Sequence, residues 1–263
     1  MKKIILTVVA VVAILISGCS KKNPDINMNN QMVEVEKVVY GEDKDQFYNI
    51  HIQNMKDPDK IIVLVHGGYW RSKYNLDHLN DLMSYLINKS FNVASVEYRR
   101  GVENQWPIPY NDVSLAINDI KKRYKNAKII TIGHSVGGQL VLLTENLVDG
   151  VIALSPVTDV YFGYKKNLGD NNAAKQYFKD HSYKNLLKAS PSNYKLKAGK
   201  NVLVVHGKND DSVLIETSDK YVKNQSDYNV NVDYLRLANM PHMEMIDSKN
   251  SHWEFIISWI EKQ

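Results

Sequence analysis

The sequence predicts an α/β protein built on a mostly parallel, doubly wound sheet with helices on both faces. Short, nearly continuous apolar runs rich in Val and Ile are typical of strands buried on both faces. Segments with helical spacing of apolar residues lie between these runs, and this alternation favours parallel strands joined by helices. The runs are 61–67, 93–98, 129–135, 151–156 and 202–207, and the helical segments are 76–88, 111–124, 138–148, 213–225 and 252–262.

The composition fits one domain of ordinary to large size. The chain has 263 residues, 44% of them apolar, which is enough to bury a sizeable core. Its formal net charge is +4; without Lys2 and Lys3, 31 basic residues stand against 29 acidic ones, a net charge of about +2. A charge this small and evenly spread argues against nucleic-acid binding.

The single cysteine excludes an intrachain disulfide. No cluster has metal-ligand spacing, so no metal or other cofactor is expected.

The first 18 residues have the layout of a secretory signal peptide. Two lysines precede an apolar run over 4–16, which is shorter than the roughly 20 residues that span a bilayer. The segment Ile16-Ser17-Gly18-Cys19 resembles the lipobox of bacterial lipoproteins. That resemblance implies cleavage before Cys19, acylation of its thiol, and a lipid-anchored protein of the cell envelope that faces away from the cytoplasm. The alternatives are an uncleaved transmembrane anchor and a buried free cysteine.

A polar, Asn-rich stretch follows, and we interpret 19–32 as the lipidated cysteine and a flexible tether. The folded domain is expected to cover 33–263. Its first two strands should lie in 33–40 and 46–53, where alternating apolar and polar residues predict half-exposed antiparallel strands. The segment 157–199 breaks the alternation of strands and helices. It is either a small cap over the ligand-binding end of the sheet or a surface insertion without a role in binding.

The segment Gly133-His134-Ser135-Val136-Gly137-Gly138 fits the pattern G-x-S-x-G, directly after one predicted strand and at the start of a helix. A nucleophilic serine needs this context, because its hydroxyl must project from a strained strand-to-helix turn. Flanking glycines leave room for such a turn. The sequence therefore predicts Ser135 as a nucleophile, against the alternative of a glycine-rich turn with an incidental serine.

Nearly all of 33–263 resembles the α/β-hydrolase family, and this resemblance implies the corresponding fold. His66-Gly67-Gly68-Tyr69-Trp70 is similar to the HGG motif of hormone-sensitive-lipase-type esterases, and more closely to the HGGYW motif of arylformamidases and related carboxylesterases. The family uses backbone N–H groups of this loop and of the residue after the nucleophile to bind an oxyanion. The implied donors are Gly68, Tyr69 and Val136. Tyr69 replaces the third glycine of the lipase-type motif, and its ring should narrow the acyl pocket.

The general base expected in this family is a histidine between the last strand and the C-terminal helix. Of eight histidines, His242 is in that loop, after the run VDYLRLA. The acid should follow the preceding strand, where the segment from Gly207 resembles the family pattern and points to Asp210, with the adjacent Asp211 left open. Asp159 is a further candidate, but we interpret it as a helix cap. The order serine, aspartate, histidine is the one expected for this fold.

Two further features are interpreted as structural. Glu97-Tyr98-Arg99-Arg100 together with Asp112 resembles a family segment and predicts a buried pair of an arginine with an acid, and a helix start. Trp70 and Trp106 could line the substrate pocket, although an aromatic residue near the edge of a core usually serves packing.

The resemblance implies a serine carboxylesterase that acts on a small-molecule substrate with a short-chain, acetyl or aryl ester. Lipid anchoring implies a membrane as its other partner, and no obligate protein partner is evident. An arylformamidase-like amide hydrolase is the first alternative. The alternative from another class is a non-catalytic envelope binding protein on the same fold.

Overall fold

A computed structural model describes residues 26–28, 31–53 and 58–263, and its centre is a sheet of eight strands in the order β10-β9-β8-β7-β5-β6-β4-β3. Strand β4 runs antiparallel to both β3 and β6, and the remaining pairs are parallel. This confirms the predicted α/β class. The strands are β3 Glu36–Val39, β4 Phe47–His51, β5 Lys60–Val65, β6 Asn92–Val96, β7 Lys128–His134, β8 Gly150–Leu154, β9 Asn201–Gly207 and β10 Asp233–Leu237.

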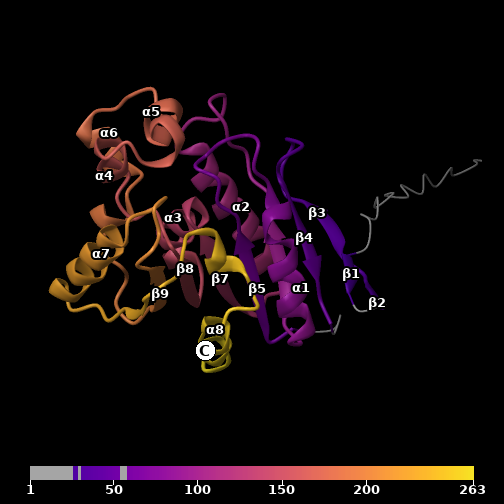
Figure 1. Cartoon of the computed structure of the whole chain (residues 1–263). Coiled ribbons are helices and arrows are strands. Elements are labelled where there is room, and N and C mark those ends of the chain that lie inside the picture. Colours follow the sequence, from indigo (N-terminus) through magenta and orange to yellow (C-terminus); the bar gives the residue numbers. More distant parts are fainter. Residues whose placement is uncertain (1–25, 29–30, 54–57) are drawn as a thin grey trace, which may run out of the picture.

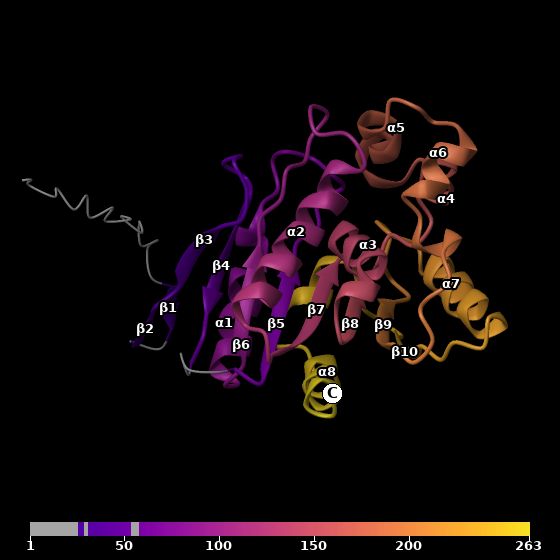
Figure 2. The ribbon, with the colours of Figure 1, turned by 180° about the vertical axis from the view of Figure 1, so that it is seen from behind.

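Helices cover both faces of the sheet, as Figures 1 and 2 show from opposite sides. Strand β5 illustrates why: Ile61, Val63 and Val65 belong to one apolar core, whereas Ile62 and Leu64 belong to the other. Because successive side chains of a strand point to opposite faces, a continuous apolar run needs helices on both. One face packs against α1 Asn80–Asn88 and α8 His252–Glu261, and the other against α2 Ile108–Arg123, α3 Val136–Leu143 and α7 Ile215–Asp227.

The segment that breaks the alternation forms three short helices at one end of the sheet (Figures 1 and 2). Asp159 accepts a hydrogen bond from the N–H of Phe162 and so caps the first of these helices, which confirms its interpretation as a cap. The helices are α4 Val160–Lys165, α5 Ala173–Tyr177 and α6 Tyr183–Lys188, with a tight irregular turn, η3 Leu168–Asn172, between the first two. Short 3₁₀ turns are η1 Leu76–Leu79, η2 Glu145–Leu147, η4 Pro191–Asn193 and η5 Met243–Ile246.

The predicted pairing of an arginine with a buried acid is present beside β6. Arg99 Nε and Nη2 each donate to the Asp112 carboxylate at 2.8 Å, and Asp112 is fully buried in α2. Arg100 Nη1 donates to the carboxylate of Glu97, which is also buried, and Arg100 Nε donates to the Tyr74 carbonyl oxygen. These pairs attach the segment after β6 to the helix layer and to the strand end, so they stabilise the edge of the sheet where the polar motifs gather.

Ahead of the domain, β1 Ile26–Met28 and β2 Gln31–Val33 pair only with each other, antiparallel, in a two-stranded sheet. The segment interpreted as a flexible tether, 19–32, therefore includes β1 and part of β2, and an isolated pair of strands is marginally stable by itself. The expected signal peptide and Cys19 lie outside the described residues. Within 26–28, 31–53 and 58–263, no helix combines the length and apolar character that crossing a membrane requires.

Candidate active site

Ser135 lies on the sharp turn from β7 into α3. Its backbone has φ 58° and ψ −118°, a conformation that L-residues rarely adopt, and the residue is almost fully buried. The flanking glycines are required by close approach: a Cβ on Gly133 would lie 2.2 Å from the Gly137 carbonyl oxygen, and one on Gly137 would lie 2.0 Å from the Val65 oxygen. The turn therefore has the geometry that the G-x-S-x-G pattern predicts.

The loop after β5 passes directly beside this serine. A Cβ on Gly67 would lie 2.8 Å from the His134 carbonyl oxygen and 2.9 Å from Ser135 Cβ. In the part of the chain that the structure describes, the backbone N–H groups of Gly68 and Tyr69 donate no hydrogen bond to a protein acceptor. The N–H of Val136, the first residue of α3, has no acceptor within its helix. These three groups remain available to a ligand oxygen.

Two residues far apart in the sequence meet beside the cavity that Ser135 lines. His242 Nδ1 donates to Asp210 Oδ2 at 2.7 Å, and both side chains are buried. Asp210 Oδ1 accepts from the N–H groups of Ser212 and Val213 at 3.0 and 2.8 Å, which holds the carboxylate in place. Asp211 is exposed, and its carboxylate accepts from the Ser212 hydroxyl instead. Of the two adjacent aspartates left open by the sequence, Asp210 is therefore the one that contacts the histidine.

A second histidine supports the same carboxylate. His206 Nε2 lies 2.8 Å from the Val213 carbonyl oxygen and 3.3 Å from Asp210 Oδ2; because both are acceptors, this nitrogen carries the hydrogen. Burial by itself raises the pKa of Asp210, but hydrogen bonds from His206 and His242 more than offset this and hold the pKa well below its usual range. Asp210 is therefore an anion that accepts from His242. No pattern in the sequence indicated this role of His206.

His134 packs against His242. Its Nε2 donates to the His242 carbonyl oxygen at 3.0 Å, and the two rings lie with centroids 4.5 Å apart. Burial, together with the neighbouring His242, lowers the pKa of His134 to about 3. The ring is therefore neutral at ordinary pH and adds no positive charge beside the imidazole of His242. No pattern in the sequence indicated this contact.

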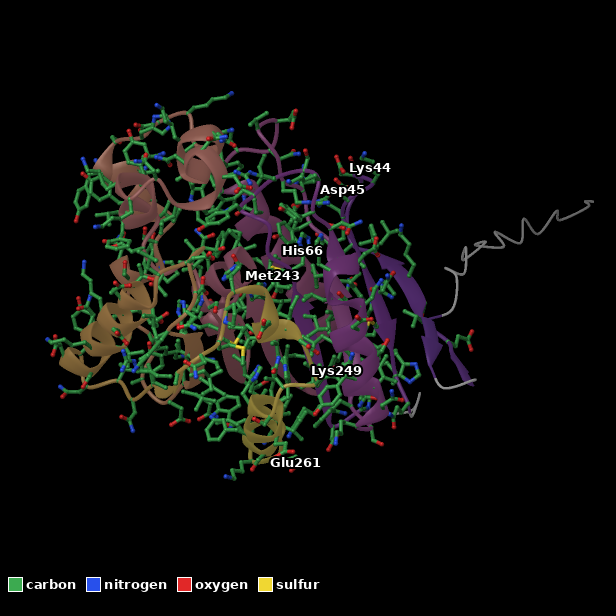
Figure 3. All side chains as sticks on the ribbon, viewed as in Figure 1. Lys44, Asp45, His66, Met243, Lys249 and Glu261 are labelled. Carbon is green, nitrogen blue, oxygen red and sulfur yellow. The ribbon has the colours of Figure 1, made fainter. Side chains whose placement is uncertain are left out.

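Ser135, His242 and the loop after β5 line one cavity of about 220 Å³. The inserted segment contributes Gly169 and Asp170 to its wall, and the segment is called the cap from here on. Met243, labelled in Figure 3, directly follows His242 in the sequence and also lines this cavity. The lining residues are Gly67, Gly68, Tyr69, Arg71, Tyr74, His78, Leu79, His134, Ser135, Gly169, Asp170, Ser212, His242, Met243 and Ile246.

Arg71 attaches the cap to the loop after β5. Its guanidinium donates to Asp170 Oδ2 at 2.9 Å, and to the carbonyl oxygens of Asp170 and Gly169 at 2.7 and 3.2 Å. Sequence reasoning did not single out Arg71, because its partners are 98 and 99 positions away. A contact of this separation leaves no periodic pattern from which it could have been found.

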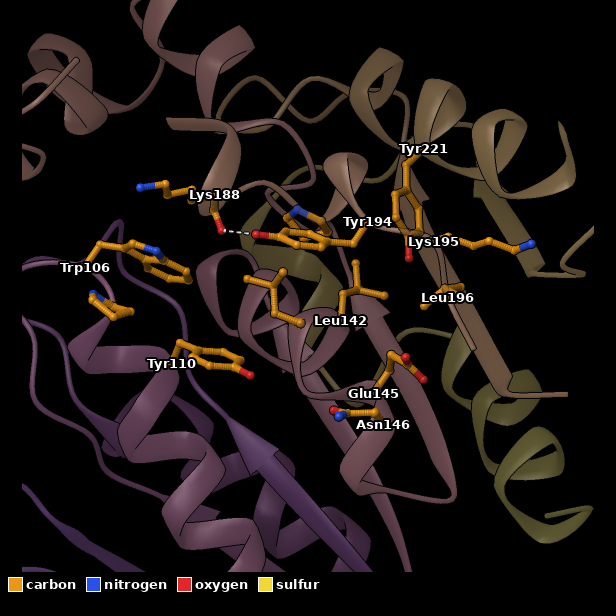
Figure 4. A pocket seen from close by; sticks show the side chains of 13 residues that line it. Trp106, Tyr110, Leu142, Glu145, Asn146, Lys188, Tyr194, Lys195, Leu196 and Tyr221 are labelled. Atoms are coloured by element: carbon orange, nitrogen blue, oxygen red, sulfur yellow. Dashed lines mark hydrogen bonds between the residues drawn. The ribbon is translucent and has the colours of Figure 1, made fainter. Parts of the chain in front are cut away.

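The two tryptophans considered for the pocket lie elsewhere. Trp70 is buried, donates to Gln139 Oε1 at 3.0 Å and stacks on Tyr177, so it serves packing. Trp106 lines a separate groove of about 450 Å³ against the helix layer, together with Tyr110 and Tyr194 (Figure 4). None of the predicted site residues lines this groove.

The fold, with its strand-to-helix serine turn and the loops at the same edge of the sheet, defines an α/β hydrolase. The chain belongs to the BD-FAE family, which it matches over residues 49–225. It is 32% identical to a kynurenine formamidase of Scheffersomyces stipitis over 121 residues, 43% of this chain and 44% of that one. It is 31% identical to a versiconal hemiacetal acetate esterase of Aspergillus parasiticus over 111 residues, 34% and 35% of the two chains.

The chain thus spans less than half the length of these two curated relatives. Among solved structures, a truncated carbohydrate esterase from gut microbiota superimposes with a TM-score of 0.72 at 17% identity, covering 86% of this chain and 95% of that one. At this level of identity the likeness concerns the fold.

Proposed function

We propose that the protein is a serine hydrolase that cleaves carboxylic esters, with Ser135, His242 and Asp210 as its catalytic triad. The observation that carries the proposal is the buried hydrogen bond of 2.7 Å between His242 and Asp210, on the wall of the cavity that Ser135 also lines. A carboxylate on Nδ1 leaves Nε2 of the imidazole without a hydrogen, as a general base requires.

The reaction follows from these positions. His242 takes the proton of Ser135 as the hydroxyl oxygen attacks the acyl carbon, and the N–H groups of Gly68, Tyr69 and Val136 bind the oxyanion that forms. His242 then gives the proton to the leaving oxygen, and the C–O bond breaks to leave an acyl-enzyme. Water, deprotonated by His242, hydrolyses the acyl-enzyme and releases the acid. Each oxyanion donor typically contributes about 3–4 kcal/mol to the stability of the transition state.

Short-chain, acetyl or aryl esters are the proposed substrates, and the acetate esterase among the relatives supports this. An arylformamidase-like activity is the second candidate, favoured by the identity of 32% to a kynurenine formamidase. Both reactions use the same acyl-enzyme chemistry and differ in the leaving group, which is an alcohol or an aryl amine. A panel of aryl acetates and N-formyl aryl amines separates the two by kcat/KM.

The first test is labelling of the purified domain with a fluorophosphonate probe, in the wild type and in Ser135→Ala. We expect covalent labelling of the wild type and none of the variant, since only an activated serine attacks the probe. Hydrolysis of one substrate class in the panel then identifies the leaving group. A folded wild type without labelling or hydrolysis would contradict the enzyme proposal and favour a non-catalytic binding protein.

We also infer that the chain is exported to a bacterial cell envelope and anchored by lipid on Cys19, after removal of 1–18. The support is the lipobox-like segment behind a charged and apolar leader. Metabolic labelling with a palmitate analogue should label the wild type, which should sediment with membranes, whereas Cys19→Ala should lose the label. Equal labelling of both proteins would contradict the anchor.

A further inference from the structure

Tyr69 lines both the cavity that contains Ser135 and a small space beneath the cap. The cavity has a volume of about 220 Å³ and is also lined by His242. The small space has a volume of about 20 Å³, room for little more than one water molecule. The small space is bounded mainly by buried apolar side chains, among them Val157, Val160, Ala174 and Val213.

Three contacts hold the Tyr69 ring in this position. Its hydroxyl donates to the Ser212 carbonyl oxygen, two residues after Asp210. Its ring lies against Gly169 of the cap, where an added Cβ would come within 2.5 Å of a ring carbon. Its other neighbour is Trp70, whose ring meets it edge to face with centroids 5.9 Å apart. Because the ring is packed on three sides, rotating it away to admit a longer ligand would cost considerable free energy.

The position of the histidine indicates which part of an ester faces Tyr69. Because His242 must protonate the leaving oxygen, the leaving group occupies the half of the cavity beside Met243 and Ile246, which lie on η5 directly after the histidine. The oxyanion faces the backbone N–H groups of the loop. The acyl substituent takes the remaining side of the tetrahedral carbon, away from η5. Tyr69 and Ser212 line the cavity and are joined by a hydrogen bond, and we assign the acyl side to them.

We propose that the Tyr69 side chain limits the length of the acyl group, so that the site selects esters and amides of formyl- or acetyl-sized acids and excludes longer chains. The inference rests on the proposed hydrolase function and adds the acyl class of its substrates. The backbone N–H of Tyr69 and its ring thus have separate roles: the first binds the oxyanion and the second ends the acyl pocket. Removing the ring joins the apolar space beneath the cap to the active-site cavity.

The test compares wild type, Tyr69→Ala and Tyr69→Phe on p-nitrophenyl acetate, butyrate, hexanoate and octanoate. Each methylene newly buried should raise kcat/KM about fourfold, which corresponds to about 0.8 kcal/mol. Hexanoate has four more methylenes than acetate, so the hexanoate-to-acetate ratio of kcat/KM should rise at least about tenfold in Y69A, and up to about 250-fold if all four are buried. Y69F keeps the ring and loses only the bond to Ser212, so its ratio should equal that of the wild type.

Acetate esters of alcohols of increasing length provide the second control, and their relative rates should be the same in Y69A and wild type. If Y69A does not fold, Tyr69→Leu is measured in its place, with a smaller rise expected. An unchanged ratio in Y69A or Y69L, an equal rise in Y69F, or a wild type that already hydrolyses hexanoate as well as acetate would each overturn the inference. A wild type that hydrolyses none of the esters and binds no fluorophosphonate overturns the proposed function instead, so the two failures are distinguishable.

Discussion

The adjacent residues Asp210 and Asp211 offer a matched pair of substitutions that tests the triad. In Asp210→Asn, the two backbone N–H groups that donate to Oδ1 at 3.0 and 2.8 Å still need an acceptor. The amide oxygen therefore takes that position, and the amide NH₂ faces His242 Nδ1, which must then accept. The proton of the imidazole moves to Nε2, the atom that should receive the proton of Ser135.

We expect kcat of D210N to fall by about 10³–10⁴-fold at neutral pH, equivalent to about 4–5.5 kcal/mol of transition-state stabilisation. Asp211→Asn removes an exposed carboxylate that accepts a hydrogen bond from the Ser212 hydroxyl, whereas the carboxylate that contacts His242 belongs to Asp210, so its kcat should stay within about threefold of wild type. Steady-state hydrolysis of p-nitrophenyl acetate measures both variants, and circular dichroism checks that they are folded. Near-normal activity of D210N, or equal losses in the two variants, would refute the reasoning.

Three further predictions concern stability and the cap. The pKa of His134 is lowered to about 3 in the folded state, so between about pH 3 and 6.5 the unfolded chain binds more protons than the folded one. The free energy of unfolding should therefore decrease by up to about 1.4 kcal/mol for each unit by which the pH is lowered through this range. Urea titrations at several pH values measure this slope, which should be shallower in His134→Gln. Gly137→Ala places a Cβ 2.0 Å from the Val65 oxygen and should lower the free energy of unfolding by more than about 3 kcal/mol, measured by thermal unfolding. Gly163→Ala in α4, where nothing lies within 4 Å of the added Cβ, should raise the free energy of unfolding by about 0.5–1 kcal/mol. Similar effects of the two substitutions would contradict the packing argument. Arg71→Met removes the bonds to Asp170 and should speed thermolysin cleavage within 165–176, and an unchanged rate would show that the guanidinium does not hold the cap.

Local patterns in the sequence predicted much of the fold. Continuous apolar runs predicted five of the buried strands, because a strand covered on both faces has no polar side to alternate with. The boundaries moved by a few residues: α2 begins at Ile108 rather than at 111, and α3 begins at Val136 rather than at 138. Helix starts depend on caps and on the preceding turn, which the spacing of apolar residues does not record.

The sequence by itself determined the fold class, the serine turn, and the loops in which a histidine and an acid were expected. These features are local, since each follows from a few consecutive residues at a strand end. Only the tertiary structure decided which of Asp210 and Asp211 contacts His242, because the direction of adjacent side chains in a loop depends on backbone angles set by the surrounding packing. It also brought Gly169 and Asp170 of 157–199 to the wall of the cavity, where Arg71 donates to the Asp170 carboxylate. Contacts between residues about a hundred positions apart form only when the chain has folded, so no sequence window contains them.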